Sequence, residues 1–171
     1  MLPPAYLEQM LRDLISQGHG PTLYICSMVA RADSIAMWSL YAEKHKGIVF
    51  GISSNLNRVI GDNGRFLQQV EYPPINERPH TPFNNPKLDD VKHVLWTKGV
   101  EWAYQKEWRI ISGNGETDFL QSGEITEIIF GWQYEGDKER WMRSEIFETT
   151  RFFDAAPCAT HYRMSIREIQ R

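Results

Sequence analysis

Hydrophobic and polar positions along the chain predict a mixture of short strands and amphipathic helices. Alternating or continuous apolar runs rich in β-branched residues are typical of strands, and they occupy 22–29, 48–52, 66–72, 124–132, 151–155 and 160–169. Apolar residues three and four apart are typical of helices, and they occupy 4–17, 33–44, 54–61, 88–98 and 136–150. The irregular spacing of the strands favours an α+β fold, with a mixed, mainly antiparallel sheet or sheets of about six strands packed by four to five helices.

A proline-rich segment interrupts this pattern. Residues 73–87 hold five prolines and no apolar periodicity, so we expect a long surface loop there. Loops of that length are often functional, and a lid over a site is one such role. The rest of the chain shows no internal repeat.

The most unusual stretch is 96–111, W-T-K-G-V-E-W-A-Y-Q-K-E-W-R-I-I, which contains three of the six tryptophans among several charges. Its alternation predicts a strand that begins near Tyr104 or Gln105 and places Glu107 and Arg109 side by side on one face. A carboxylate on a buried face must be paired or hydrated, because an unpaired buried charge is costly. The pattern leaves two interpretations open: a site for chemistry, or an ion pair that ties the strand to its neighbours.

Composition narrows the class of protein. The chain has 171 residues, 42% of them apolar, which suits a single domain over 1–171 with its own core. A net charge of −3 gives no electrostatic footprint for nucleic acid. The start of the chain resembles no signal peptide and no apolar run is long enough for a membrane span, so we expect a cytoplasmic protein with free, mostly buried thiols at Cys26 and Cys158.

Several common chemistries lack their motifs. The five histidines show no H-x-x-x-H spacing, which argues against a metal site of that kind, and there is no G-x-S-x-G elbow. Cys26 is interpreted as a core residue and His45 as a solvated residue at a helix end. Trp38 and Tyr41 suit either a core or the wall of a pocket.

Five ordered blocks of the chain resemble the bacterial family called domain of unknown function 2971. They are L-Y-I-C-S (23–27), M-W-S-L-Y-A-E-K-H-K-G-I-V-F-G-I (37–52), V-E-Y-P (70–73), K-G-V-E-W-A-Y-Q-K-E-W-R-I (98–110) and I-T-E-I-I-F-G (125–131). Members usually begin with a further segment, whereas this chain begins with the predicted helix within 1–20, so the resemblance is to a short or truncated member. Gln105 also stands where the family usually has glutamate.

The block that ends in E-W-R resembles the E-x-E strand of ADP-ribosyltransferases. In those enzymes the second glutamate stabilises the positive charge that develops on the ribose as nicotinamide departs from NAD. The resemblance implies catalytic roles for Glu107 and, on the same strand face, Gln105; a Q-x-E pair makes arginine a less suitable target. The residues implied to contact NAD are Lys98, Tyr104, Arg109, Trp38 and Tyr41, with Arg31 as a poor substitute for the usual NAD anchor.

Three hypotheses about function follow. The first is an NAD-dependent ADP-ribosyltransferase-like protein of a toxin or phage-defence system, with NAD as substrate and no metal. The second, of equal weight, is a non-catalytic partner-binding or regulatory module of the same family, in which Glu107 is locked by Arg109 or Lys98. The third, nucleic-acid processing without NAD, has no support from the charge. The macromolecular target and the oligomeric state are not determined by the sequence.

Overall fold

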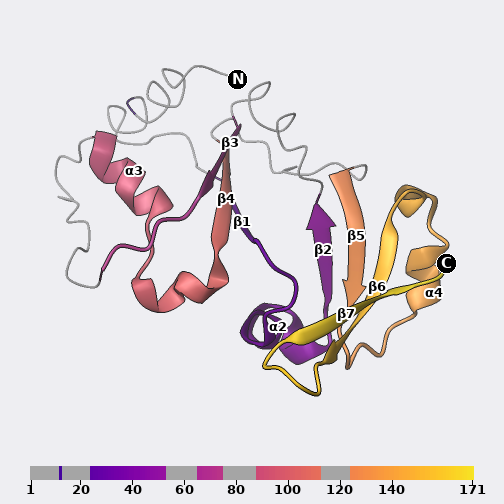
Figure 1. Ribbon diagram of the computed structural model, residues 1–171. Helices are drawn as coiled ribbons and strands as arrows, with labels where there is room; N and C mark the ends of the chain where they lie inside the picture. Colours follow the sequence, from indigo (N-terminus) through magenta and orange to yellow (C-terminus); the bar gives the residue numbers. More distant parts are fainter. Residues whose placement is uncertain (1–11, 13–23, 53–64, 75–87, 113–123) are drawn as a thin grey trace. The chain divides into compact units, whose positions relative to one another are not determined.

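The computed structural model describes residue 12 and residues 24–52, 65–74, 88–112 and 124–171. The chain divides into two compact units, one formed by Met1–Ala30 and Asn55–Phe119, the other by Arg31–Ser54 and Leu120–Arg171. The predicted single domain therefore comprises two units, and each is described by itself below (Figure 1).

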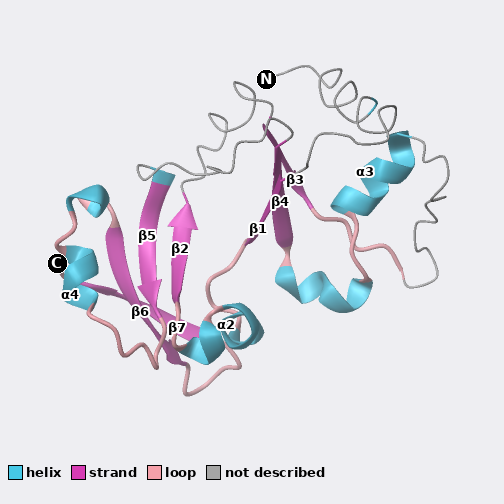
Figure 2. Ribbon diagram, turned by 180° about the vertical axis from the view of Figure 1, so that it is seen from behind, coloured by secondary structure: helices cyan, strands magenta, loops and turns pink. Residues whose placement is uncertain are grey.

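The first unit contains a three-stranded antiparallel sheet in the order β1-β4-β3. Its strands are β1 (Tyr24–Val29), β3 (Arg65–Gln69) and β4 (Glu107–Ser112). Ile110 and Ile111 of the central strand are both fully buried, so both faces of β4 are covered. The helix α3 (Leu88–Trp96) and the 3-10 helix η4 (Val100–Gln105) precede β4 along the chain (Figure 2).

The boundary between η4 and β4 differs from the prediction. Gln105 closes a 3-10 turn, and Lys106 follows in the left-handed conformation, with φ 47° and its N–H donated to Ala103 O. The left-handed residue redirects the backbone, and β4 therefore begins only at Glu107. The predicted strand start at Tyr104 or Gln105 is wrong, and Gln105 does not share a strand face with Glu107.

The second unit contains a four-stranded sheet in the order β2-β5-β6-β7. Its strands are β2 (Ile48–Ile52), β5 (Ile125–Phe130), β6 (Arg151–Pro157) and β7 (Met164–Ile169). Only the β5–β6 pairing is parallel among the described strands; the mainly antiparallel α+β class is thus confirmed.

Consecutive residues of β5 enter two different cores, which explains why its second half, Ile128 to Phe130, is apolar without interruption. Ile129 packs with Trp38 of α2 (Ile35–Tyr41), and Ile128 and Phe130 pack with Phe152. Two short helices that follow β5 contribute to this second core, α4 (Lys138–Met142) and the 3-10 helix η6 (Glu145–Phe147).

Two predicted helices are shorter than expected. The predicted helix over 136–150 is wrong, because α4 ends at Met142 and Ser144 is extended before η6 begins. The helix predicted to reach residue 44 ends at Tyr41, and the 3-10 turn η1 (Glu43–His45) follows with φ of 49°, 52° and 71° at three residues other than glycine. Such left-handed residues cost free energy, and neighbouring contacts must hold them in place.

The remaining predictions vary in outcome. The strand over 48–52 is confirmed at both ends, while the strand predicted to Tyr72 ends at Gln69. The helices predicted over 4–17 and 54–61, and nearly all of the proline loop, lie outside the described residues. Within the described parts of the chain, no helix is long and apolar enough to cross a membrane.

Candidate functional site

The carboxylate of Glu107, at the first position of β4, is the centre of a buried polar cluster. The residue is 4% exposed, and its Oε1 accepts hydrogen bonds from Ser27 Oγ and Arg109 Nε, each 2.8 Å away. Lys98 Nζ donates to Oε2, also at 2.8 Å. One negative charge therefore interacts with two cations and one hydroxyl inside the first unit.

Strand register explains how two of these donors reach Glu107. Ser27 of β1 lies opposite Arg109 in the antiparallel ladder, and Glu107 is two residues before Arg109 on the same face of β4. Residues diagonal to each other across a strand pair are close enough for side-chain contact. The structure confirms that Glu107 and Arg109 are neighbours on one face of β4. It also shows Ser27 as a further neighbour of Glu107.

The lysine comes from the segment between α3 and η4. The backbone holds this segment next to Glu71, because Glu71 N–H donates to Trp96 O and Lys98 N–H donates to Glu71 O. Lys98 Nζ then bridges Glu107 and Gln105, whose Oε1 is 2.5 Å away, and lies 5.3 Å from the centre of the Trp102 ring. Lys98 thus connects η4 to the first residue of β4.

Backbone groups complete the cluster. Tyr72 Oη accepts the N–H of Glu107 at 2.8 Å, and a guanidinium N–H of Arg109 donates to the carbonyl oxygen of Leu95 at the end of α3. Ser27, Tyr72, Lys98 and Glu107 come from three separate blocks of the sequence, and the fold brings these blocks together at one carboxylate.

Burial and hydrogen bonding act in opposite directions on the acidity of Glu107. Burial raises the pKa of this carboxyl, but the hydrogen bonds from Arg109, Lys98 and Ser27 outweigh burial and lower the pKa to about 2. The group is therefore ionised throughout the physiological range.

This depressed pKa predicts a loss of stability in acid. Ionised Glu107 stabilises the fold fully above its ordinary pKa of 4.5, and this contribution is lost as the pH falls toward about 2. The difference corresponds to about 3 kcal/mol. In urea unfolding at stepped pH, we expect the stability difference between wild type and Glu107→Gln to shrink as the pH falls below 4.5; a constant difference down to pH 3 would contradict the assignment.

The other predicted site residues have contacts of their own. Tyr104 is 45% exposed and its ring centre lies 6.1 Å from that of Trp102, on the surface of η4. In the second unit, Trp38 is buried in the core and donates its indole N–H to Ala32 O at 2.6 Å, whereas Tyr41 is 65% exposed. Arg31 forms an exposed ion pair with Asp33. No group of three or more potential metal ligands occurs among the described residues.

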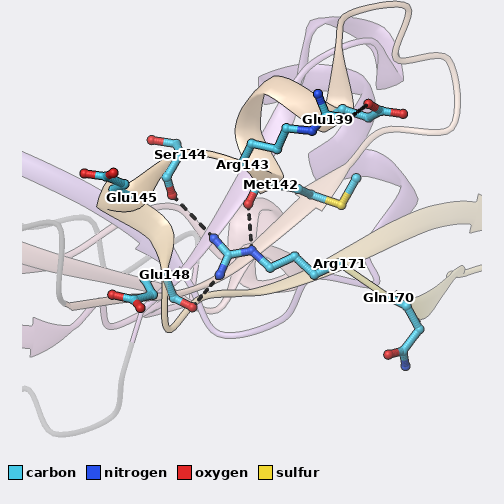
Figure 3. Close-up of a pocket in the computed structure, with 8 residues that line it drawn as sticks. All are labelled: Glu139, Met142, Arg143, Ser144, Glu145, Glu148, Gln170 and Arg171. Carbon is cyan, nitrogen blue, oxygen red and sulfur yellow. Dashed lines mark hydrogen bonds and ion pairs between the residues drawn. The ribbon is translucent and has the colours of Figure 1, made fainter.

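A pocket of about 830 Å³ lies in the second unit, along α4, η6 and the end of the chain (Figure 3). The guanidinium of Arg171 points among carbonyl oxygens there, and donates to Met142 O and Glu148 O at 2.6 Å each. Through these hydrogen bonds the Arg171 side chain connects the residues that follow β7 with the α4–η6 segment. None of the predicted site residues lines this pocket.

Ser27 and Tyr72 are the cluster members that sequence reasoning missed as partners of Glu107. Both lie within blocks that resemble the family, so the blocks were a usable signal. The sequence does not reveal the register between β1 and β4, and this register makes Ser27 a neighbour of Glu107.

Comparison with known proteins yields one family. The model of the family described as "Protein of unknown function (DUF2971)" matches residues 37–110, a span that includes Lys98, Glu107 and Arg109. No curated protein and no solved structure matches the chain significantly. The match confirms the predicted resemblance to this family over residues 37–110.

Proposed function

We propose that the chain is a partner-binding or regulatory module in which the Glu107 cluster has a structural role. The observation that carries this proposal is the state of the carboxylate, which is 4% exposed and accepts from Ser27, Lys98 and Arg109. A carboxylate that stabilises positive charge on a sugar must face the sugar. The carboxylate of Glu107 instead faces donors from its own fold.

The surface of η4 is the contact surface that this arrangement supports. Trp102 is 37% exposed and Tyr104 45% exposed, and Lys98 lies over the Trp102 ring. Exposed aromatic side chains next to a cation are typical of protein–protein contact surfaces. Because Lys98 also holds Gln105 and Glu107, the cluster fixes η4 on the sheet and limits the entropy that these rings lose on binding.

NAD-dependent ADP-ribosyl transfer, as in a toxin or phage-defence protein, is a second candidate function. The observation that favours it is that Lys98 Nζ brings Gln105 and an ionised Glu107 together. NAD would have to displace at least one of the donors that now occupy the carboxylate. The two proposals therefore predict different responses to NAD.

Calorimetric titration of NAD separates the two functions. For a binding module we expect no saturable heat at millimolar NAD with wild type. Saturable binding to wild type, lost in a Glu107→Gln variant whose circular dichroism is unchanged, would contradict the binding module and favour the transferase. The thermal transition of the Glu107→Gln variant shows whether the variant is folded. The decision between the two functions depends on whether wild type binds NAD.

A double variant of η4 tests this contact surface. In cross-linking with mass spectrometry in source-cell extract, we expect a Trp102→Ala/Tyr104→Ala variant to keep the wild-type melting temperature and lose its cross-linked partner. Val94→Ala is the matched control, because Val94 is an exposed apolar residue of α3 in the same unit. Equal cross-linking by the double variant and the control would exclude η4 as the contact surface.

A further inference from the structure

The loop between β6 and β7 gathers a thiol, a hydroxyl and an imidazole within four residues. Thr160 Oγ1 lies 3.5 Å from Cys158 Sγ and 2.8 Å from His161 Nδ1, and Sγ lies 3.9 Å from the same nitrogen. Thr160 and His161 are exposed and Cys158 is partly exposed. The three groups belong to the second unit and have no part in the Glu107 cluster.

The backbone of the loop keeps these groups together. Cys158 N–H donates to Arg163 O at 2.9 Å, and Arg163 N–H donates to His161 O at 2.8 Å, so the chain curls back on itself directly after β6. Met164 N–H then donates to Asp33 O at 2.9 Å, which attaches the far end of the loop to the segment before α2. The cluster is thus built into the β6–β7 turn.

We propose that Cys158 is a redox modification site that reacts with low-molecular-weight disulfides, with Thr160 and His161 as positioning residues. The Thr160 hydroxyl accepts the thiol proton and passes its own proton to His161 Nδ1. The Cys158 thiolate then attacks one sulfur of the disulfide, forms a new S–S bond, and displaces the other sulfur as a thiolate. That leaving thiolate takes the proton from the imidazolium, so one thiol and one disulfide give one mixed disulfide and one thiol.

The acidity of the two cysteines agrees with this assignment. Hydrogen bonds from the side chain and backbone of Thr160, and then of His161, lower the pKa of the Cys158 thiol to about 6. Burial raises the pKa of the Cys26 thiol in β1. Cys26 is therefore an internal reference for an unreactive thiol in the same chain.

Neighbouring charges do not oppose the thiolate. The loop from Cys158 to Arg163 contains no acidic residue, and its charged side chain is that of Arg163. On the adjoining segment, Asp33 is paired with Arg31 at 2.6 Å.

The test is the rate of reaction with dithiobis(nitrobenzoate), measured from pH 5 to 9 on full-length Cys26→Ser and Cys158→Ser proteins. With Cys158 alone, we expect a rate profile with its midpoint near pH 6. With Cys26 alone, we expect a low rate that reaches no plateau within this range, because burial raises the pKa of that thiol. Glutathione disulfide and peptide mapping on wild type give a second measurement, which requires no cysteine variant. We expect the mixed disulfide on Cys158.

Variants of the loop test whether Thr160 and His161, and not the exposure of Cys158 alone, determine the reaction rate. In a Thr160→Val/His161→Ala protein we expect the pKa of Cys158 to return toward its ordinary value, so that at pH 6 far less of the thiol is ionised. Each thiolate is then a better nucleophile, which offsets part of the loss. The net rate at pH 6 is up to about 20-fold lower than that of the protein with an intact loop. Above pH 8 the two rates converge or reverse. Tyr162→Ala, at a fully exposed position of the same loop, is the control and leaves the profile unchanged. A wild-type midpoint above pH 8, or a profile that the double variant does not shift, overturns the proposal.

Discussion

Replacement of Glu107 by alanine is expected to lower the free energy of unfolding by about 3–5 kcal/mol, because it leaves two cations without their counter-charge. Lys98 and Arg109 both donate to this carboxylate from positions shielded from solvent. Ser27 also loses its acceptor. Urea unfolding, with hydrogen exchange at β1 and β4 to locate the change in the first unit, measures the effect.

The control for this experiment is Glu101→Ala. Glu101 lies six residues earlier, in η4, and is exposed, so its removal should change stability by no more than about 0.5 kcal/mol. Similar losses in the two variants would show that Glu107 is not the structural centre of the cluster. The structural part of the proposed function would then fail.

Gly131→Ala is expected to destabilise the second unit by about 3 kcal/mol or more, because backbone atoms already occupy the space that a methyl group needs. A Cβ at Gly131 would overlap the carbonyl oxygen of His45 and lie 2.8 Å from the His45 carbonyl carbon and 2.9 Å from Gly47 O. His45 cannot move freely, since its carbonyl accepts Gln133 N–H and its φ of 71° is already left-handed. Thermal unfolding with hydrogen exchange at β2 and β5 measures the loss.

Gly99→Ala is the matched control for this substitution. The atoms nearest to a Cβ at Gly99 would be those of the Glu101 carboxylate, which is exposed and can rotate away, and φ at Gly99 is −58°. We expect a change within about 1 kcal/mol. If Gly131→Ala were as stable as Gly99→Ala, the close contact between Gly131 and the His45 turn would not exist.

The close contact also connects two blocks of the sequence. His45 and Gly47 belong to the block over 37–52, and Gly131 ends the block over 125–131. Gly131 N–H donates to Gly47 O at 3.0 Å, so a backbone hydrogen bond joins the two blocks. The backbones can approach this closely because Gly131 has no side chain. Gly131 is thus required by a turn that lies more than eighty residues away in the sequence.

The sequence by itself determined several local elements of this protein. Runs such as I-V-F-G-I and I-T-E-I-I-F predicted β2 and β5 because β-branched and aromatic residues favour strands. Alternation placed Glu107 and Arg109 on one face, and the structure has their side chains 2.8 Å apart. Five blocks of residues also resemble the family whose model matches residues 37–110.

Only the tertiary structure decided what those elements do together. Because Lys106 is left-handed, β4 begins at Glu107 and Gln105 belongs to η4. The alternating pattern of side chains around Lys106 does not reveal this change in backbone direction. The β1–β4 register and the parallel bridge between Glu71 and Thr97 brought Ser27 and Lys98 to Glu107, and such long-range pairing leaves no mark in a local pattern. Glu107, which the sequence singled out, is the centre of this polar cluster, and long-range pairing supplied its partners.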